Sequence, residues 1–368
     1  MIEYPQGWRD IEVALAHDWL SGMRGGERVL ELLCNGFPSA EIYTLVHNPS
    51  AISETINSHR VHASFLQRFP RVENYYRYLL PLMPTAIERM RPGSVDLVVS
   101  TSHCVAKGLI PPAGARHVCY CFTPMRYAWQ FYKEYFGNNP LKKAVLKPLL
   151  ARMRDWDRRA SERVDRFIAI SNHVRARIER HYGRQADVVY PPVDLDYYKP
   201  GAGEPTADFD LIVSALVPYK RIDLAVRAYT RSGEPLKLVG VGTEFDALSR
   251  MAGENIEFLG WRSYEEIREL YRNCRQLVFP GEEDFGLVPV EAQACGRPVV
   301  AYAKGGALET VQDGVSGVFF KEQSEDALID ATRRAADTGW DSSAIRRSAE
   351  RFGIKQFLNG LDAVISDS

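Results

Sequence analysis

The chain alternates short, continuously apolar runs with amphipathic helical stretches, and this alternation limits most strongly what it can fold into. Runs that are apolar at consecutive positions are typical of parallel strands covered on both faces. Helical stretches between such strands indicate the α/β class. The rhythm runs to about residue 190 and starts again at 209. The predicted strands are 11–19, 96–103, 115–122, 166–171, 209–216, 236–242, 256–260, 276–281 and 297–302.

The interruption in this rhythm predicts two doubly wound domains. The segment YPPVDLDYYKPGAGEPTADFD, residues 190–210, is rich in proline, glycine and acidic residues, as domain linkers are. We therefore expect a first domain over 1–190, a linker near 191–208 and a second domain over 209–345. Doubly wound sheets bind ligands at the carboxyl ends of their strands, so we expect the two domains to face a cleft.

Composition excludes several classes of protein. The chain carries 46 Lys and Arg against 47 Asp and Glu, which argues against a dedicated nucleic-acid binder. The balance differs between the halves, since residues 1–200 hold 27 basic and 20 acidic side chains and 201–368 hold 19 and 27. No apolar run approaches the roughly 20 residues of a membrane span, and the N-terminus lacks the apolar core of a signal peptide. We expect a cytoplasmic protein.

The six cysteines are scattered and form no C-x-x-C motif. Such usage is typical of a reducing compartment. A zinc site needs clustered ligands, and Cys119-x-Cys121 has no matching pair. We therefore expect no metal site.

The stretch FPGEEDFGLVPVEAQACGRPVVAY, residues 279–302, carries the most chemical information. It predicts a strand, an acidic loop and a helix that begins near Leu287. The free N–H groups at a helix N-terminus suit a phosphate, and Phe285 and Gly286 lie where they would direct those groups. Glu283 precedes the helix, and Glu291 lies eight residues later, where it can accept hydrogen bonds from a ribose. The spacing by itself is equally consistent with an alternative that has no ligand, in which an acidic loop is followed by a helix whose glutamate is solvated.

The Glu283-Asp284-Phe285-Gly286 sequence with Glu291 resembles the E-x7-E motif of the retaining glycosyltransferases of family 4 (GT4), which have the GT-B fold. Asp284 stands where that family usually has a glycine. Other segments resemble the family in the expected order, so the resemblance covers essentially the whole chain. They are HDWLSGMRGGERVLE (17–31), CYCFTPMRYAWQFYKEYF (119–136), VSALVPYKRIDLAVRAY (213–229) and YAKGGALETV (302–311).

The resemblance implies two Rossmann-like domains, transfer from a nucleotide sugar, no metal cofactor, and a last helix, 351–368, that crosses back to the first domain. The segments 17–31 and 119–136 resemble a bacterial subgroup that contains mannosyltransferases of O-antigen and exopolysaccharide synthesis. This implies GDP-mannose as donor and a polyprenyl-diphosphate-linked glycan as acceptor. Two alternatives stay open: a UDP-sugar-dependent transferase of the same fold, and a catalytically inactive protein that binds nucleotide sugars or glycans.

In the second domain the resemblance assigns the first glutamate, Glu283, to the hydroxyls of the donor sugar and Glu291 to the ribose. It assigns Lys220 to the leaving diphosphate, whose developing charge a fixed cation stabilises. The family usually has an arginine five residues before this lysine, where this chain has Ala215, and Arg221 is the candidate replacement. The remaining residues assigned to donor binding are Ser214, Gly242, Phe285, Gly286 and Leu287.

In the first domain the resemblance implies that His103 reaches the donor sugar and that Gly25 and Gly26 lie near the donor phosphate. Arg126 and Asp18 are assigned to the acceptor. Each of these residues also has a structural alternative. His103 could be a packed histidine at a strand end, and Gly25 and Gly26 could form a turn that enters a helix. Arg126 could be a structural arginine, and Asp18 could be a capping carboxylate.

The stretch 141–166 holds nine Lys and Arg and four Asp and Glu, with apolar residues at helical spacing. The apolar residues are Leu146, Leu149, Leu150, Met153 and Trp156. One interpretation is a helix on an anionic membrane, in peripheral contact with the inner face of the plasma membrane. The other is a solvated helix that packs its apolar side into the first domain.

Overall fold

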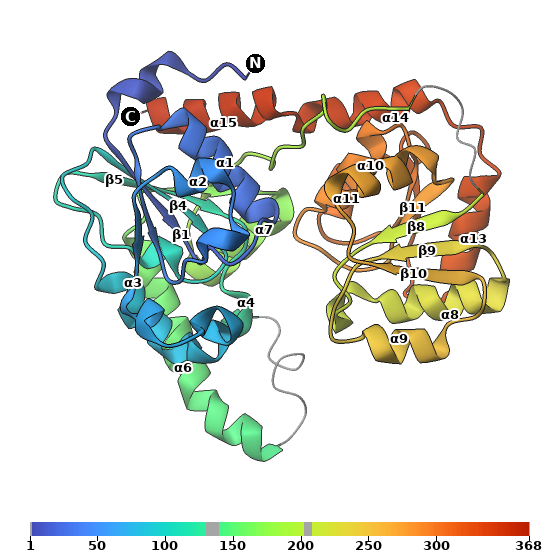
Figure 1. Ribbon diagram of the computed structural model, residues 1–368, viewed down its shortest axis with the longest axis horizontal. Coiled ribbons are helices and arrows are strands. Elements are labelled where there is room, and N and C mark those ends of the chain that lie inside the picture. The colour runs from blue at the N-terminus through green and yellow to red at the C-terminus, as the bar shows by residue number, and fades with distance from the viewer. Residues whose placement is uncertain (1, 130–139, 202–207, 368) are drawn as a thin grey trace. The chain divides into compact units, whose positions relative to one another are not determined.

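The computed structural model describes residues 2–129, 140–201 and 208–367, and for 140–146 it describes the backbone alone. The chain groups into two compact units (Figure 1). The first comprises Met1–Tyr190 together with Leu358–Ser368, and the second comprises Pro191–Phe357. Residues 202–207 of the predicted linker lie outside the described residues.

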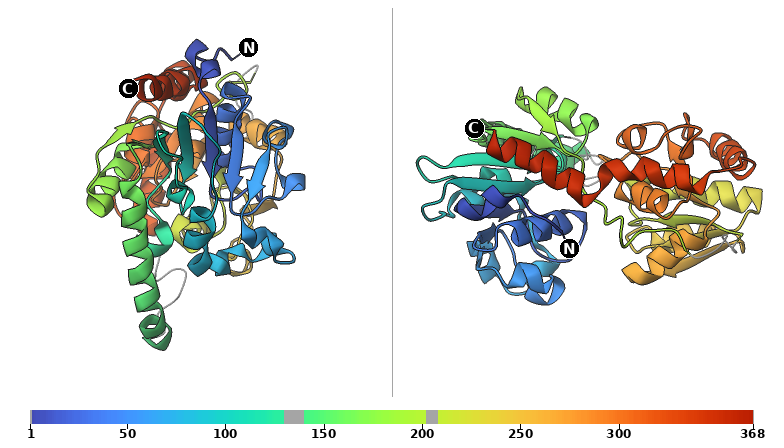
Figure 2. Two further views of the ribbon diagram at one scale, coloured as in Figure 1. Left: turned by 90° about the vertical axis from the view of Figure 1, so that its left-hand side faces the viewer. Right: turned by 90° about the horizontal axis from the view of Figure 1, so that it is seen from above.

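The described part of the first unit contains a seven-stranded parallel sheet in the order β3-β2-β1-β4-β5-β6-β7. The central strands β1 and β4 are buried along their whole length, beneath helices that flank the sheet (Figure 2). This burial explains their continuous apolar sequence. The strands are β1 Val13–His17, β2 Glu41–Thr44, β3 Val61–Ala63, β4 Leu97–Ser102, β5 Arg116–Cys121, β6 Arg166–Ala169 and β7 Ala186–Val188.

Helix α1 shows how the helices of this unit form. Val29, Leu30 and Leu33 recur at helical spacing and are buried, and Glu27 accepts a hydrogen bond from the backbone N–H of Arg24 at the helix start. The helices are α1 Gly25–Gly36, α2 Glu54–Asn57, α3 Met83–Glu88, α4 Arg126–Trp129, α6 Pro140–Glu162 and α7 Asn172–Tyr182. Short 3-10 helices are η1 Gln6–Asp10, η2 Pro49–Ala51, η3 Phe65–Arg68, η4 Val72–Asn74, η5 Tyr76–Leu82 and η6 Ala106–Gly108.

The apolar side of α6 packs into the core of the first unit. Leu150, Met153 and Trp156 are buried, and Leu149 packs against the same core cluster. Leu150, Met153 and Trp156 are therefore not available for insertion into a membrane, and for them the helix packs its apolar side into the first domain, as the second interpretation predicted. The side chain of Leu146 lies outside the described residues. No helix among the described residues is both long and apolar enough to span a bilayer.

A buried ion pair between Lys107 and Asp157 ties α6 to the loop after β4. Asp157 also accepts hydrogen bonds from Trp129 Nε1 at 2.7 Å and from Tyr182 Oη at 2.8 Å. Burial alone would lower the pKa of Lys107, but the Asp157 carboxylate outweighs that effect and raises it. One carboxylate on α6 thus joins this helix to three other elements of the first unit, η6, α4 and α7.

The described part of the second unit contains a six-stranded parallel sheet in the order β10-β9-β8-β11-β12-β13. The strands are β8 Asp210–Val213, β9 Leu236–Val239, β10 Ile256–Gly260, β11 Gln276–Phe279, β12 Val299–Tyr302 and β13 Gly317–Phe320. The helices are η7 Pro218–Lys220, α8 Ile222–Ser232, α9 Phe245–Met251, α10 Tyr264–Asn273, α11 Leu287–Ala294, α12 Ala307–Thr310, α13 Glu325–Ala336, α14 Ser342–Ala349 and η8 Glu350–Phe352. The prediction of an α/β protein with two doubly wound parallel sheets is confirmed.

The last helix, α15 Ile354–Ser366, starts in the second unit, and from Leu358 onward it belongs to the first. Its carboxyl half is held in the first unit by two hydrogen bonds. Trp8 Nε1 donates to Asp362 at 2.9 Å, and Arg116 donates to the carbonyl of Ile365 at 2.8 Å. Residues far apart in sequence thereby share one core.

We expect Lys107→Met to lower the free energy of unfolding by about 3 kcal/mol or more, because Asp157 would stay buried without its charge partner. Urea denaturation of the full-length chain measures this. The control is Arg159→Met, which breaks an exposed ion pair with Asp155 of 3.3 Å and should cost less than about 1 kcal/mol. Equal losses in the two variants would contradict the assigned role of Asp157.

Candidate active site

Two loops at the carboxyl edge of the second sheet are joined through their backbones. Glu283, in the loop between β11 and α11, forms a parallel bridge with Gly305, and the N–H of Gly306 donates to its carbonyl at 2.8 Å. A Cβ on Gly306 would lie 2.3 Å from the Cα of Phe285, so a larger residue does not fit. The structure thus brings the predicted E-x7-E segment and the later Gly-Gly segment together.

Gly286 caps the start of α11 with a φ of +96°, a conformation that favours glycine. A Cβ at this position would also lie 3.3 Å from the ring of Phe279. The helix that begins at Leu287 therefore presents its first N–H groups beside the Glu283 loop. This arrangement can receive an anion.

Lys220 and Glu283 form an ion pair at this edge, and both side chains are largely buried. Lys220 ends η7, which follows β8, and Glu283 follows β11, the neighbour of β8 in the sheet. Gly281 lets the two segments approach, since a Cβ there would lie 2.8 Å from the carbonyl oxygen of Lys220. The structure places a cation and a carboxylate, predicted separately, in direct contact.

Arg221 adopts a φ of +54°, which is uncommon for a residue with a side chain. Its guanidinium donates to Asp223 at 3.2 Å and to Gln323 at 2.7 Å. Gln323 in turn donates to the carbonyl of Pro280 at 3.1 Å, three residues before Glu283. The structure gives Arg221 this bracing role, and its role as a second cation toward the diphosphate stays a prediction.

Glu291, on α11, accepts a hydrogen bond from Tyr271 Oη at 2.9 Å. Tyr271 belongs to α10 and is fully buried, and this burial raises its pKa well above the usual range. The neutral phenol therefore acts as a permanent donor that orients the Glu291 carboxylate. Nothing in the sequence near Tyr271 or Gln323 pointed to these contacts, because both partners are distant in the chain.

Gly242 lies where the segments after β8 and β9 cross. The N–H of Leu216 donates to the carbonyl of Val241 at 3.0 Å, and a Cβ on Gly242 would lie 2.2 Å from the carbonyl oxygen of Leu216. Ser214, after β8, donates from Oγ to the carbonyl of Ala215 at 3.1 Å. Gly242 is thus needed for backbone packing, and donor contact by these two residues stays a prediction.

In the first unit the Asp18 carboxylate accepts hydrogen bonds from four consecutive backbone N–H groups after β4. The donors are His103, Cys104, Val105 and Ala106, at 2.6 to 2.9 Å. Asp18 has no exposed surface. Its carboxylate therefore holds the loop after β4, and its role toward the acceptor stays a prediction.

His103 Nδ1 lies 3.0 Å from Asp18 Oδ2, and its ring packs edge-on against Trp19 at 4.5 Å. Burial alone would raise the pKa of Asp18, but the charge of His103 and the hydrogen bonds to the carboxylate hold it below its usual range. About a third of the His103 side chain is exposed. Asp18 thus positions His103, which keeps a surface for a ligand.

Gly25 and Gly26 open α1 beside these residues, and a Cβ on Gly26 would lie 3.3 Å from the Phe122 ring and 3.5 Å from the His17 ring. Arg126 begins α4, which Arg154 holds through a 2.6 Å hydrogen bond to the carbonyl of Ala128. The structure places these residues in the first unit, and their roles toward donor and acceptor stay predictions.

Two family models match the chain almost end to end. The model described as Glycosyltransferase Family 4 matches residues 23–197, and the model described as Glycosyl transferases group 1 matches residues 202–352. The fold and the matched models together define a glycosyltransferase with two Rossmann-like domains. The chain belongs to the GT4 family of GT-B glycosyltransferases.

Named relatives agree with this family. A D-inositol 3-phosphate glycosyltransferase from Mycolicibacterium smegmatis is 32% identical over 222 residues, which is 54% of this chain and 49% of that protein. An uncharacterized glycosyltransferase from Methanocaldococcus jannaschii is 30% identical over 174 residues, 46% of this chain and 49% of that protein. The chain spans about half the length of these curated relatives in the matches.

Solved structures share the fold at low identity. A lipopolysaccharide outer core galactosyltransferase gives a TM-score of 0.68 at 16% identity, covering 97% of this chain and 99% of that one. An Anabaena protein in complex with UDP and glucose gives a TM-score of 0.67 at 19% identity, and the match covers 97% of this chain and 100% of that one. Sucrose-phosphate synthase from Thermosynechococcus elongatus gives a TM-score of 0.70 at 18% identity, and the match covers 96% of this chain and 98% of that one.

We expect acid to destabilise the protein through Asp18. Its folded pKa is lowered, so below about pH 4 the unfolded chain binds more protons than the folded one and stability falls. Asp18→Asn should lose this acid dependence and be less stable at pH 7 by about 3 kcal/mol, because an amide N–H₂ would face backbone donors. Thermal unfolding from neutral pH to pH 3 measures both effects.

The control for this prediction is Asp155→Asn, which changes an exposed aspartate in the same unit. It should unfold like the wild type at every pH. An identical acid profile in the wild type and Asp18→Asn would show that Asp18 does not carry the dependence.

Proposed function

We propose that this protein transfers mannose from GDP-mannose, with retention of configuration, to a polyprenyl-diphosphate-linked glycan in polysaccharide synthesis. The observation that supports transfer chemistry most directly is the largely buried Lys220–Glu283 pair beside the start of α11. Membership of the glycosyltransferase family supports the reaction class. The choice of mannose and of a lipid-linked acceptor rests on the resemblance of residues 17–31 and 119–136.

The proposed mechanism gives each residue one task. Lys220 stabilises the charge that develops on the leaving diphosphate, together with the N–H groups at the start of α11. When the donor binds, its diphosphate competes with Glu283 for the ammonium group, which frees the carboxylate to accept hydrogen bonds from the sugar hydroxyls. Glu291, oriented by Tyr271, accepts hydrogen bonds from the ribose. The leaving phosphate accepts the acceptor proton, so the reaction needs no side-chain base.

The proposal includes no metal cofactor, as the family resemblance implies. It places the enzyme in the cytoplasm, in peripheral contact with the inner face of the plasma membrane, where a polyprenyl acceptor is held. A UDP sugar is the second candidate donor, since one solved structure of the same fold is a complex with UDP-glucose.

We expect Lys220→Met and Glu283→Gln each to lower kcat/KM for transfer by roughly 100-fold or more, because each removes a charged group from the reacting centre. A matched control is Lys237→Met, which breaks another lysine–glutamate pair of the same unit, 3.3 Å from Glu257 on the neighbouring strand. It should keep the wild-type rate. Wild-type rates in both Lys220→Met and Glu283→Gln would contradict the assignment of these residues to the active site.

We expect GDP-mannose to raise the melting temperature more than UDP-, ADP- or dTDP-sugars, because a ligand that binds only the folded state stabilises it. At about 100 times its Kd a ligand adds about 2.7 kcal/mol. Lys220→Met should lose most of this shift. A larger shift with UDP-glucose would replace the proposed donor with the second candidate, and no shift with any donor would contradict nucleotide-sugar binding.

A further inference from the structure

The segment 65–82 of the first unit, formed by η3, η4 and η5, exposes large apolar side chains. Phe69 and Leu82 are each 42% exposed and Tyr78 is 85% exposed. Among the described residues of the first unit, only Ile2 shares this property of a large apolar side chain exposed by more than a third. Three of these four residues thus fall within one short stretch.

The same segment is firmly anchored on its other side. Leu66, Val72, Tyr76 and Leu80 are buried in the core of the first unit. Tyr76 also packs against Trp19 at 5.0 Å. The exposed apolar side chains are therefore presented by a fixed backbone, and they are not the consequence of a segment without packing partners.

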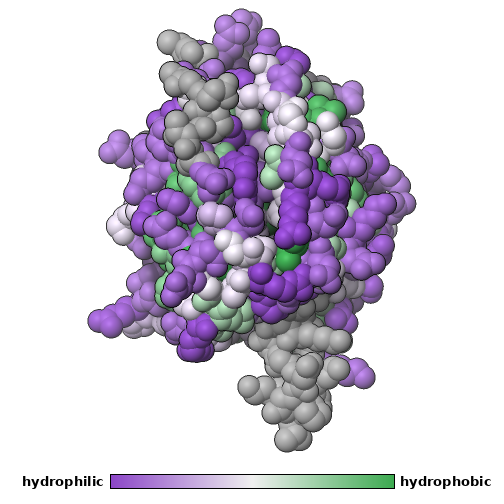
Figure 3. Space-filling model, turned by 90° about the vertical axis from the view of Figure 1, so that its right-hand side faces the viewer, coloured by the Kyte–Doolittle hydropathy of each residue, from purple (hydrophilic) through white to green (hydrophobic). Residues whose placement is uncertain are grey.

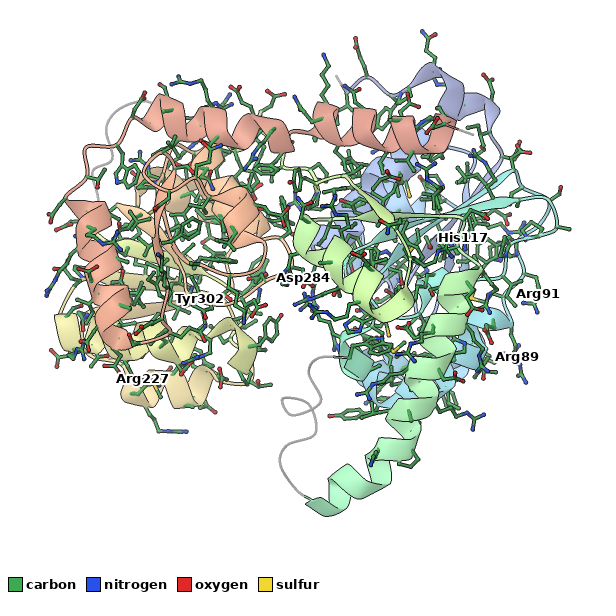
Figure 4. All side chains as sticks on the ribbon, turned by 180° about the vertical axis from the view of Figure 1, so that it is seen from behind. Arg89, Arg91, His117, Arg227, Asp284 and Tyr302 are labelled. Carbon is green, nitrogen blue, oxygen red and sulfur yellow. The ribbon has the colours of Figure 1, made fainter. Side chains whose placement is uncertain are left out.

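Arginines are frequent in this segment and in the residues that follow it. Five of them are exposed: Arg68, Arg71, Arg77, Arg89 and Arg91. Within the residues that the structure describes, none of the five lies within 4.0 Å of a carboxylate oxygen. Glu88, a carboxylate from the same part of the chain, is bound by Arg163 at 2.7 Å and by Trp156 Nε1 at 2.9 Å. Figure 4 shows Arg89 and Arg91 at the outer edge of the first unit in that view.

Arg71 links η3 to η4 with a φ of +53°. A residue with a side chain is strained in this conformation, and glycine would be favoured there. The position therefore carries an exposed cation where folding alone would favour glycine. This points to a use for the charge outside the fold.

Two other surfaces lack this combination. Among the described side chains of α6, Leu150, Met153 and Trp156 are buried, Leu149 is half-buried, and Arg159 is paired with Asp155. The face of the second unit in Figure 3 is mostly hydrophilic, with apolar side chains only in small spots.

We propose that the surface formed by Arg68, Phe69, Arg71, Arg77, Tyr78 and Leu82, the arginine–aromatic surface, docks the first unit on an anionic lipid bilayer. The guanidinium groups bind lipid phosphates, and the apolar side chains enter the boundary between headgroups and acyl chains. Positive charge that no carboxylate neutralises, next to exposed aromatic residues in the chain, is complementary to this partner. The inference rests on the proposed function in one respect, since a lipid-linked acceptor requires the enzyme to reach a membrane.

The experiment is co-sedimentation of the full-length protein with vesicles, without donor or acceptor. One set contains equal amounts of phosphatidylglycerol and phosphatidylcholine, and the other contains phosphatidylcholine alone. The wild type should bind the anionic vesicles and bind less as salt screens the charges. The triple variant Arg68→Glu, Arg71→Glu, Arg77→Glu should bind roughly 100-fold less, at about a factor of five per charge. Tyr78→Ser should bind several-fold less.

Arg71→Gly separates binding from folding. Glycine relaxes the backbone at this position, so the variant should melt no lower than the wild type while it binds anionic vesicles about fivefold less. The matched controls are Arg152→Glu with Arg158→Glu and Arg159→Glu on α6, and Val315→Ser at an exposed site of the second unit. They should bind like the wild type.

Wild-type binding by the triple variant would overturn the proposal, as would loss of binding in the α6 variant alone. Equal binding to both kinds of vesicle would also overturn it, because the arginines would then have no role. Vesicle binding needs no transfer activity, so a protein that binds these vesicles but transfers no sugar would refute the proposed function and leave the docking surface standing.

Discussion

The parallel direction of every strand that the structure describes is the constraint on which the rest of this molecule depends. In each sheet the carboxyl ends of neighbouring strands meet at one edge, and residues distant in the chain become neighbours there. Lys220 follows β8, Glu283 follows β11 and Gly305 follows β12, and this common edge brings them into contact. A charged pair with a helix N-terminus beside it is the direct product of that topology.

Charged and polar side chains then fix the loops that the parallel sheets leave at their edges. Asp18 holds the loop after β4 through four backbone N–H groups, and Asp157 holds Lys107, Trp129 and Tyr182. In the second unit, Gln323 connects Arg221 to the carbonyl of Pro280. Each of these groups is satisfied by several partners, as burial of a polar group requires.

Site residues that belong to a sequence motif could be predicted from the sequence. The residues that hold them in place through hydrogen bonds could not. Glu283, Glu291 and Lys220 stand in segments whose spacing and resemblance identify them. Asp18 also stands in such a segment, and only the fold shows that its buried carboxylate holds the loop after β4. Tyr271 and Gln323 belong to no motif, because their hydrogen bonds join parts of the chain that only folding brings together.

The sequence by itself determined the α/β class, the two doubly wound sheets and the helix that starts at Leu287, because apolar periodicity and helix starts are local properties of the chain. Only the tertiary structure decided which side of α6 is buried, which lysine faces Glu283 and which arginines at 68–91 have no carboxylate partner. These are pairings between distant residues, and the free energy of a charge or an apolar side chain depends on the neighbours that the fold supplies.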